Sequence, residues 1–204
     1  MAINLNKGGS INLDKGLSLV GVGLGWATAE GEEFDLDASA FMLGADGQIP
    51  NERAMIFYNN LCGRGHQKSC PGCAEGMDGV RHTGDDRGDE ASEDEEGDRE
   101  TLIVDLSKVP SNIKEIVFVV TIDQWQARRQ NFGQVRNSYI RVVNQANDQE
   151  IARYELTEDF SSETAVEFGK LCRPEGNWKF CAIGIGYKSV GLEKFVEKFA
   201  RAFQ

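Results

Sequence analysis

Carboxylates at a short, regular spacing are the residues whose chemistry is easiest to interpret in this chain. Asp35 and Asp37 lie two residues apart, so a regular strand sends both side chains to the same face. Two carboxylates on one face repel each other unless a cation lies between them. Asn59 and Asn60, at the end of the next predicted strand, offer neutral oxygens. Because calcium takes about six to eight oxygen ligands, this combination indicates a cation site.

The acidic segment 85–100 can supply the remaining oxygen ligands. It holds ten Asp or Glu against two Arg, and therefore carries most of the net charge of −11. Gly84, Gly88 and Gly97 permit the sharp turns that aim oxygens at an ion. The segment lacks the calcium-loop spacing of an EF-hand. A simple solvated acidic loop is the alternative interpretation, since runs of like charge are commonly solvated.

A second metal-ligating pattern precedes the acidic segment. Its spacing is C-x3-H-x3-C-x2-C, and it consists of Cys62, His66, Cys70 and Cys73. Three thiolates and an imidazole can bind zinc tetrahedrally and so order a polar loop. A disulfide or redox role, and a flexible loop with exposed thiols, are the alternatives. The other two of the five cysteines, Cys172 and Cys181, are expected to be small core residues.

No catalytic constellation accompanies these ligands. The chain has no nucleotide-binding glycine loop and no nucleophile-elbow motif, and its two histidines, His66 and His82, both fall in predicted loops. We expect Arg128, Arg129, Arg136 and Arg141 to pair with the acidic segment. The sequence therefore favours a binding module over an enzyme. The alternative is a metal-dependent hydrolase in which calcium or magnesium positions a phosphate group of the substrate.

The elements that must position these residues are mostly strands. Apolar and glycine residues alternate over 20–26, which predicts a strand with one bare face, and the apolar run 116–122 predicts a central buried strand. Further strands are predicted at 34–43, 54–58, 102–106, 139–143, 150–156 and 178–187. Short helices are predicted from Ser161 or Ser162 through Leu171, and from Leu192 onward. This pattern predicts a β-sandwich of two sheets with short peripheral helices.

Length and charge limit the remaining classes. A chain of 204 residues suits a single domain, residues 1–204, with a loop insertion at about 61–101. No apolar run is long enough to span a membrane and no leader pattern opens the chain, so we expect a cytoplasmic protein that does not insert into membranes. The net charge of −11 disfavours nucleic acid as a partner.

Ordered sequence blocks occur along nearly the whole chain. They are LNKGG (5–9), VGVGLGW (20–26), FDLDAS (34–39), FYNN (57–60), HTGDD (82–86), VFVVTI (117–122), QNFGQVRN (130–137), ETA (163–165), WKF (178–180) and GIGY (184–187). Together they resemble the TerD family of bacterial tellurite-resistance and stress-response proteins. The resemblance implies a TerD-like β-sandwich that binds calcium. It also implies a role in tellurite and other stress responses, with resistance to phage and colicins. Its partners would be proteins of a stress-response system, with a membrane-associated partner left open.

The resemblance also implies the ligand set. The Asp-x-Asp strand, the Asn-Asn strand end and the acidic loop would bind calcium through Asp35, Asp37, Asn59, Asn60, Asp85, Asp86, Asp89, Glu96, Asp98 and Glu100. Two features depart from the family pattern. Arg99 stands where a carboxylate is usual, so one ligand is either lost or supplied by Asp94 or Glu95. The cysteine-containing segment 61–79 is an insertion, because family members run almost directly from Asn-Asn to the acidic loop.

Overall fold

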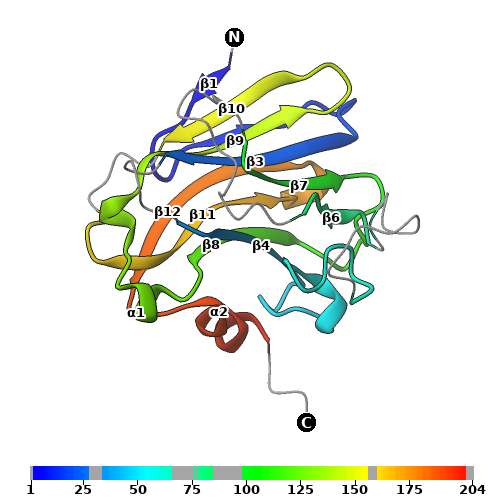
Figure 1. The fold of residues 1–204 in the computed structure, drawn as a ribbon. Coiled ribbons are helices and arrows are strands. Elements are labelled where there is room, and N and C mark those ends of the chain that lie inside the picture. Colours follow the sequence, from blue (N-terminus) through cyan, green and yellow to red (C-terminus); the bar gives the residue numbers. More distant parts are fainter. Residues whose placement is uncertain are drawn as a thin grey trace.

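Two six-stranded β-sheets stacked face to face form the body of the protein in this computed structural model, which describes residues 2–27, 34–65, 76, 78–84, 98–155 and 160–200 (Figure 1). Sheet A contains, in spatial order, β1 (Ile3–Asn4), β10 (Gln149–Glu155), β9 (Arg136–Asn144), β3 (Leu19–Ala27), β7 (Glu100–Asp105) and β6 (Val80–His82). Sheet B contains β2 (Ser10–Asn12), β12 (Lys179–Lys188), β11 (Glu163–Cys172), β8 (Glu115–Ile122), β4 (Leu36–Leu43) and β5 (Met55–Ile56). The predicted two-sheet sandwich is confirmed.

β3 crosses the middle of sheet A between β7 and β9. Its apolar side chains at even positions, Val20 to Trp26, are buried between the sheets, as the alternation predicts. The prediction of a bare opposite face is wrong. A Cβ added to the glycines would collide with side chains that lie directly over the strand: Gln145 over Gly21, Asp98 over Gly23 and Tyr139 over Gly25. The glycines therefore make room for a layer of polar side chains on the outer face of sheet A.

β8 lies at the centre of sheet B, between β4 and β11, so the prediction for the apolar run is confirmed. Apolar side chains on both faces suit this position. One face of the strand packs against sheet A, and the side chains on its other face are buried as well. Phe118 of β8 is fully buried. Removing one such side chain from water contributes about 1.5–3 kcal/mol to the stability of the fold.

The prediction of a helix through Leu171 is wrong, because these residues form the long strand β11 between β8 and β12. The sequence suggested a helix because Ser161 or Ser162 can act as its N-cap. In the fold, Glu167 is buried and forms an ion pair with Lys198, and Lys170 bonds Glu115 with 2.6 Å between Nζ and Oε1. These charges find partners far away in sequence, so the local pattern does not reveal the strand.

Short helices lie at the ends of the sandwich and on the outer face of sheet B. Single turns are η1 (Glu52–Ala54), η3 (Phe132–Gln134), η4 (Pro174–Gly176) and α1 (Trp125–Arg128). α2 (Leu192–Phe199) confirms the predicted C-terminal helix and lies against sheet B (Figure 1). Its Phe199 ring is 5.1 Å from the Phe41 ring on β4. Among the described residues, no helix has the length and apolar character that crossing a membrane requires.

Candidate cation site

The site begins at a stretch of β4 that has no paired strand on its β5 side. The predicted strand at 54–58 is reduced to β5, which pairs with β4 only at Ala40 and Phe41. Ala38 lies beyond the end of β5, so its amide receives no partner from that strand. The amide instead donates to Oε2 of Glu100 over 2.5 Å. A charged acceptor thus completes the backbone hydrogen bonding where the strand partner is missing.

Glu100 reaches this edge from the other sheet. It starts β7 and pairs with Leu24 of β3, whose side chain is buried between the sheets, so Glu100 also points inward. Its side chain is 1% exposed, and Oε2 lies 3.4 Å from Nε2 of His82. Gly84 donates its amide hydrogen to Nδ1 of the same ring over 3.1 Å. Because Nδ1 accepts this bond, a neutral His82 ring carries its proton on Nε2, the ring nitrogen nearer to Glu100 Oε2.

His82 is consequently not the loop residue that the sequence suggested. It ends β6, is buried, and donates its backbone amide to the Leu61 carbonyl over 2.7 Å. Nothing in its immediate sequence marks it as buried, and the Ala38 amide is equally invisible to sequence patterns. Both become partners of Glu100 only because the two sheets meet at this edge.

Asp37 lies beside the same backbone amide. It pairs with Thr121 in the middle of sheet B and is 8% exposed. Glu100 bonds the peptide group that joins Asp37 to Ala38, so two acidic residues from different sheets are neighbours at this peptide group. Asp35 immediately precedes β4, and its carbonyl accepts the Asp123 amide hydrogen over 2.8 Å. Burying carboxylates close together costs free energy unless positive charge or hydrogen bonds offset it.

Asn60 has a positioning role in the described structure. Its Nδ2 donates to the Met55 carbonyl over 2.7 Å, and its Oδ1 accepts the Gly65 amide hydrogen over 2.8 Å. These bonds shape the turn that follows β5, from which Leu61 contacts His82. Asn59 lies in the same turn and is partly exposed.

Asp98 lies apart from Glu100, although only one residue separates them. Its carboxylate covers Gly23 on the outer face of sheet A, whereas Glu100 points to the inner face. Oδ1 of Asp98 accepts from Arg141 Nε over 2.7 Å and from the Tyr139 hydroxyl over 3.1 Å. Burial works against the charge of Arg141, but its bonds to Asp98 and a neighbouring glutamate outweigh burial and raise its pKa.

Arginine pairing thus agrees in part with expectation. The predicted pairing of Arg141 with the acidic segment is confirmed by its contact with Asp98. Arg128 pairs instead with Asp123, with 3.6 Å between Nη2 and Oδ2. Asp98 therefore serves in the structure as the acceptor of a polar layer on sheet A.

Several predicted ligands lie outside the described residues. For calcium these are Asp85, Asp86, Asp89 and Glu96, and for zinc they are His66, Cys70 and Cys73. Cys62 is described, fully buried and disulfide-bonded. Because zinc binds thiolates, a zinc site that includes Cys62 requires its reduced form. Within the described part of the chain, no group of three or more His, Cys, Asp or Glu side chains forms a complete metal cage.

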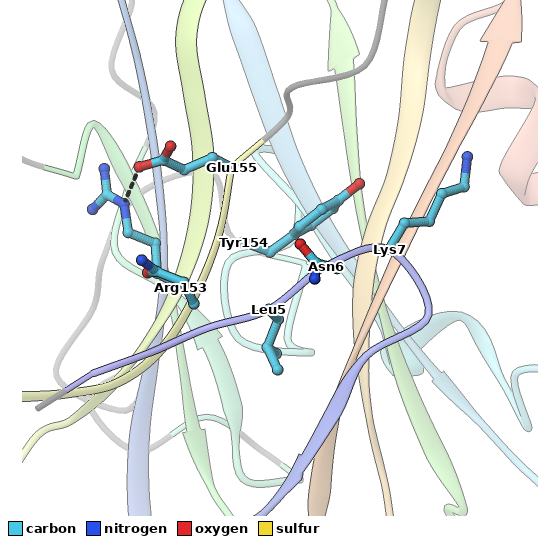
Figure 2. A pocket seen from close by; sticks show the side chains of 7 residues that line it. Leu5, Asn6, Lys7, Arg153, Tyr154 and Glu155 are labelled. Atoms are coloured by element: carbon cyan, nitrogen blue, oxygen red, sulfur yellow. Dashed lines mark hydrogen bonds and ion pairs between the residues drawn. The ribbon is translucent and has the colours of Figure 1, made fainter.

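A pocket between the N-terminal segment and β10 contains two basic residues. It has a volume of about 170 Å³ and is lined by Asn4, Leu5, Asn6, Lys7, Arg153, Tyr154 and Glu155 (Figure 2). Arg153 already bonds Glu155, with 3.2 Å between Nε and Oε1, and its guanidinium lies 3.5 Å from the centre of the Tyr139 ring. Lys7 lies on the far side of the pocket from this pair (Figure 2). The pocket therefore does not gather convergent charges around a ligand.

Comparison with known proteins decides the family. A family model described as the TerD domain matches residues 1–199. The chain belongs to the TerD family. Tellurium resistance protein TerD from Alcaligenes sp is 48% identical to it over 192 residues, which is 92% of each chain. General stress protein 16U from Bacillus subtilis (strain 168) is 46% identical over 205 residues, covering 98% of this chain and 97% of that protein.

A solved structure supports the TerD fold independently. The crystal structure of a homologue of telluride resistance protein (TerD) from Streptomyces coelicolor A3(2) superposes with a TM-score of 0.63 at 18% identity. The superposition covers 88% of this chain and 95% of the other. The resemblance suggested by the sequence blocks is thus confirmed, and this TerD domain has the β-sandwich of its structural neighbour.

Proposed function

We propose that this TerD domain is a calcium-binding stress-response module that binds protein partners when calcium is bound, and that it is not an enzyme. One arrangement carries the proposal. Two buried acidic residues come from different sheets and are neighbours at one peptide group, because Glu100 accepts the Ala38 amide hydrogen and Asp37 directly precedes Ala38. A divalent cation at this edge would offset the cost of burying their charges.

The acidic segment is attached where such an ion would need it. Residues 85–97 follow Gly84, which contacts His82, and precede Asp98 and Glu100. Thr83 donates its amide hydrogen to the Thr101 carbonyl over 3.0 Å, so the two flanks of the segment lie side by side. The segment contains many carboxylates, and calcium accepts varied oxygen sets more readily than magnesium, which requires a tight octahedron. These observations favour calcium.

The stress role is supported by the relatives, which are named for tellurium resistance and general stress. We propose a cytoplasmic location and protein partners, a membrane-associated one included. The net charge of −11 disfavours nucleic acid as a partner. Calcium would reduce the negative charge around Asp37 and Glu100, which is how binding of the ion would control partner binding. Zinc at the cysteine insertion stays a separate prediction.

A thermal melt of chelated protein with calcium added back tests the proposal. At one hundred times the dissociation constant, calcium should stabilise the fold by about 2.7 kcal/mol. For a domain of this size, that gain raises the melting temperature by about 5–11 °C. Asp37→Asn and Glu100→Gln should each reduce the rise, since each removes a charge from the site.

Asp148→Asn is the matched control. It removes the same charge from an exposed position in the turn between β9 and β10, and it should leave the calcium response unchanged. A wild-type melt that does not respond to millimolar calcium would exclude the proposal. An equal response in wild type and Asp37→Asn would exclude this location for the ion.

A further inference from the structure

Two thiols face each other at one end of sheet B. Cys172 ends β11 and Cys181 lies near the start of β12, and their Sγ atoms are 3.5 Å apart. In the antiparallel register Cys172 pairs with Lys179, and Lys170 pairs with Cys181, so the cysteines are diagonal neighbours. Both are free thiols. The expectation that Cys172 lies in a helix is wrong, because it belongs to a strand.

The pair lies on the face of sheet B that points away from the core. Leu171 and Phe180, paired between them in the register, are fully buried in the sandwich. Neighbouring residues of a strand point to opposite faces, so Cys172 and Cys181 point outward. Cys172 is 7% exposed, whereas Cys181 is partly exposed. A small reagent can therefore reach the pair from the side of Cys181.

The sulfur separation allows both thiols to bind one central atom. A disulfide requires a separation of about 2.05 Å, well below the 3.5 Å found here. If each sulfur lies about 2.3 Å from one central atom, as in thiolate–zinc bonds, a 3.5 Å separation corresponds to an angle of about 100° at that atom. This angle fits a pyramidal centre and excludes a linear one. The thiols thus have the separation of a chelating pair.

The type of central atom follows from the number of ligands. Zinc would need two more protein ligands, and among the described residues no third His, Cys, Asp or Glu joins the pair. A trivalent metalloid makes only three bonds, of which two can go to sulfur and one to hydroxide. We propose that Cys172 and Cys181 form a dithiol site that binds trivalent metalloid hydroxides of the arsenite type.

The binding step is a condensation without redox change. Two S–H bonds and two metalloid–oxygen bonds break, two metalloid–sulfur bonds form, and each thiol proton leaves with a hydroxide as water. The metalloid stays trivalent, so no oxidant or reductant is needed. Burial and then the neighbouring Cys181 raise the pKa of Cys172 to about 12, which keeps that thiol protonated at neutral pH. This works against attack on peroxides, which requires a thiolate. In the condensation, the thiol proton is the one that leaves with the hydroxide as water.

Phenylarsine oxide, which condenses with two thiols and releases one water, is the probe. Reduced full-length protein should retain one arsenic that bridges the peptides containing Cys172 and Cys181, as located by mass spectrometry after proteolysis. A small dithiol should remove this arsenic, whereas an equivalent monothiol should not. Cys172→Ser and Cys181→Ser should each abolish the bridging adduct.

The other three cysteines are controlled separately. A protein with Cys62→Ser, Cys70→Ser and Cys73→Ser should still bind one arsenic per chain. If that variant does not fold, the bridged peptides of the wild-type protein decide the matter. Arsenic found only on the segment 62–73 would overturn the proposal. So would a Cys172→Ser protein that carries arsenic on Cys181 as the wild-type protein does.

Discussion

Glu100 offers a sharp test of how the two sheets are joined at the cation site. Its Oε2 accepts the buried Ala38 amide hydrogen over 2.5 Å and lies 3.4 Å from Nε2 of His82. Glu100→Ala removes this acceptor and leaves a buried amide without it. A hydrogen bond to a charged group contributes about 1.5–3 kcal/mol, and an unsatisfied buried donor costs about 1–3 kcal/mol. We therefore expect a loss of about 3 kcal/mol in the free energy of unfolding.

Glu100→Gln keeps a side-chain oxygen of nearly the same shape in the same place. It should stay within about 1 kcal/mol of wild type without calcium, because it keeps the bond to Ala38 and removes a charge near Asp37. Urea denaturation of chelated protein measures both variants. The corresponding melting temperatures should differ by roughly 6–12 °C for the alanine variant. If the alanine and glutamine variants are equally stable, Glu100 does not satisfy the Ala38 amide.

Three further predictions concern other parts of the fold. Gly23→Ala places a Cβ 2.0 Å from Oδ2 of Asp98 and should lower the free energy of unfolding by about 1–3 kcal/mol, as measured by urea denaturation. Gly16→Ala is the control, because its Cβ would meet nothing within 4 Å. Equal losses in the two variants would contradict the polar layer on β3. Burial opposes the charge of Lys198, but its bond to Glu167 outweighs burial and raises its pKa, so stability present below about pH 10.5 should be lost as pH rises through the folded pKa. Glu167→Gln should flatten this alkaline loss in melts across pH, and an unchanged slope would contradict the pairing. Ester and phosphoester substrates should not be turned over above background with calcium or magnesium; a rate that Glu100→Gln abolishes would promote the hydrolase alternative.

The fold was largely predictable because most strands carry their own signals. The apolar run of β8 and the alternation of β3 depend on burial, which leaves a direct pattern in the sequence. β11 was not predictable in this way. Its buried Glu167 and its Lys170 resemble the polar face of a helix, and their partners Lys198 and Glu115 are remote in sequence.

The candidate site was predictable only in part. The spacing of Asp35 and Asp37 and the resemblance to the TerD family pointed to the strand β4, next to which the candidate site lies. The meeting of Glu100 with the Ala38 amide was not predictable, because it depends on β5 ending two residues short of Ala38 along β4. The placement of Asp98 on the opposite face of sheet A from Glu100 likewise follows from the glycine at position 23, over which its carboxylate lies.

Isothermal titration of chelated protein with calcium tests the central claim most directly. The account predicts saturable binding to wild type, weaker binding of magnesium, and an affinity lowered about tenfold or more by Asp37→Asn, since a lost charged ligand costs roughly 1.5–3 kcal/mol. Asp148→Asn should bind like wild type. No binding heat at millimolar calcium, or equal affinity in wild type and Asp37→Asn, would contradict the account.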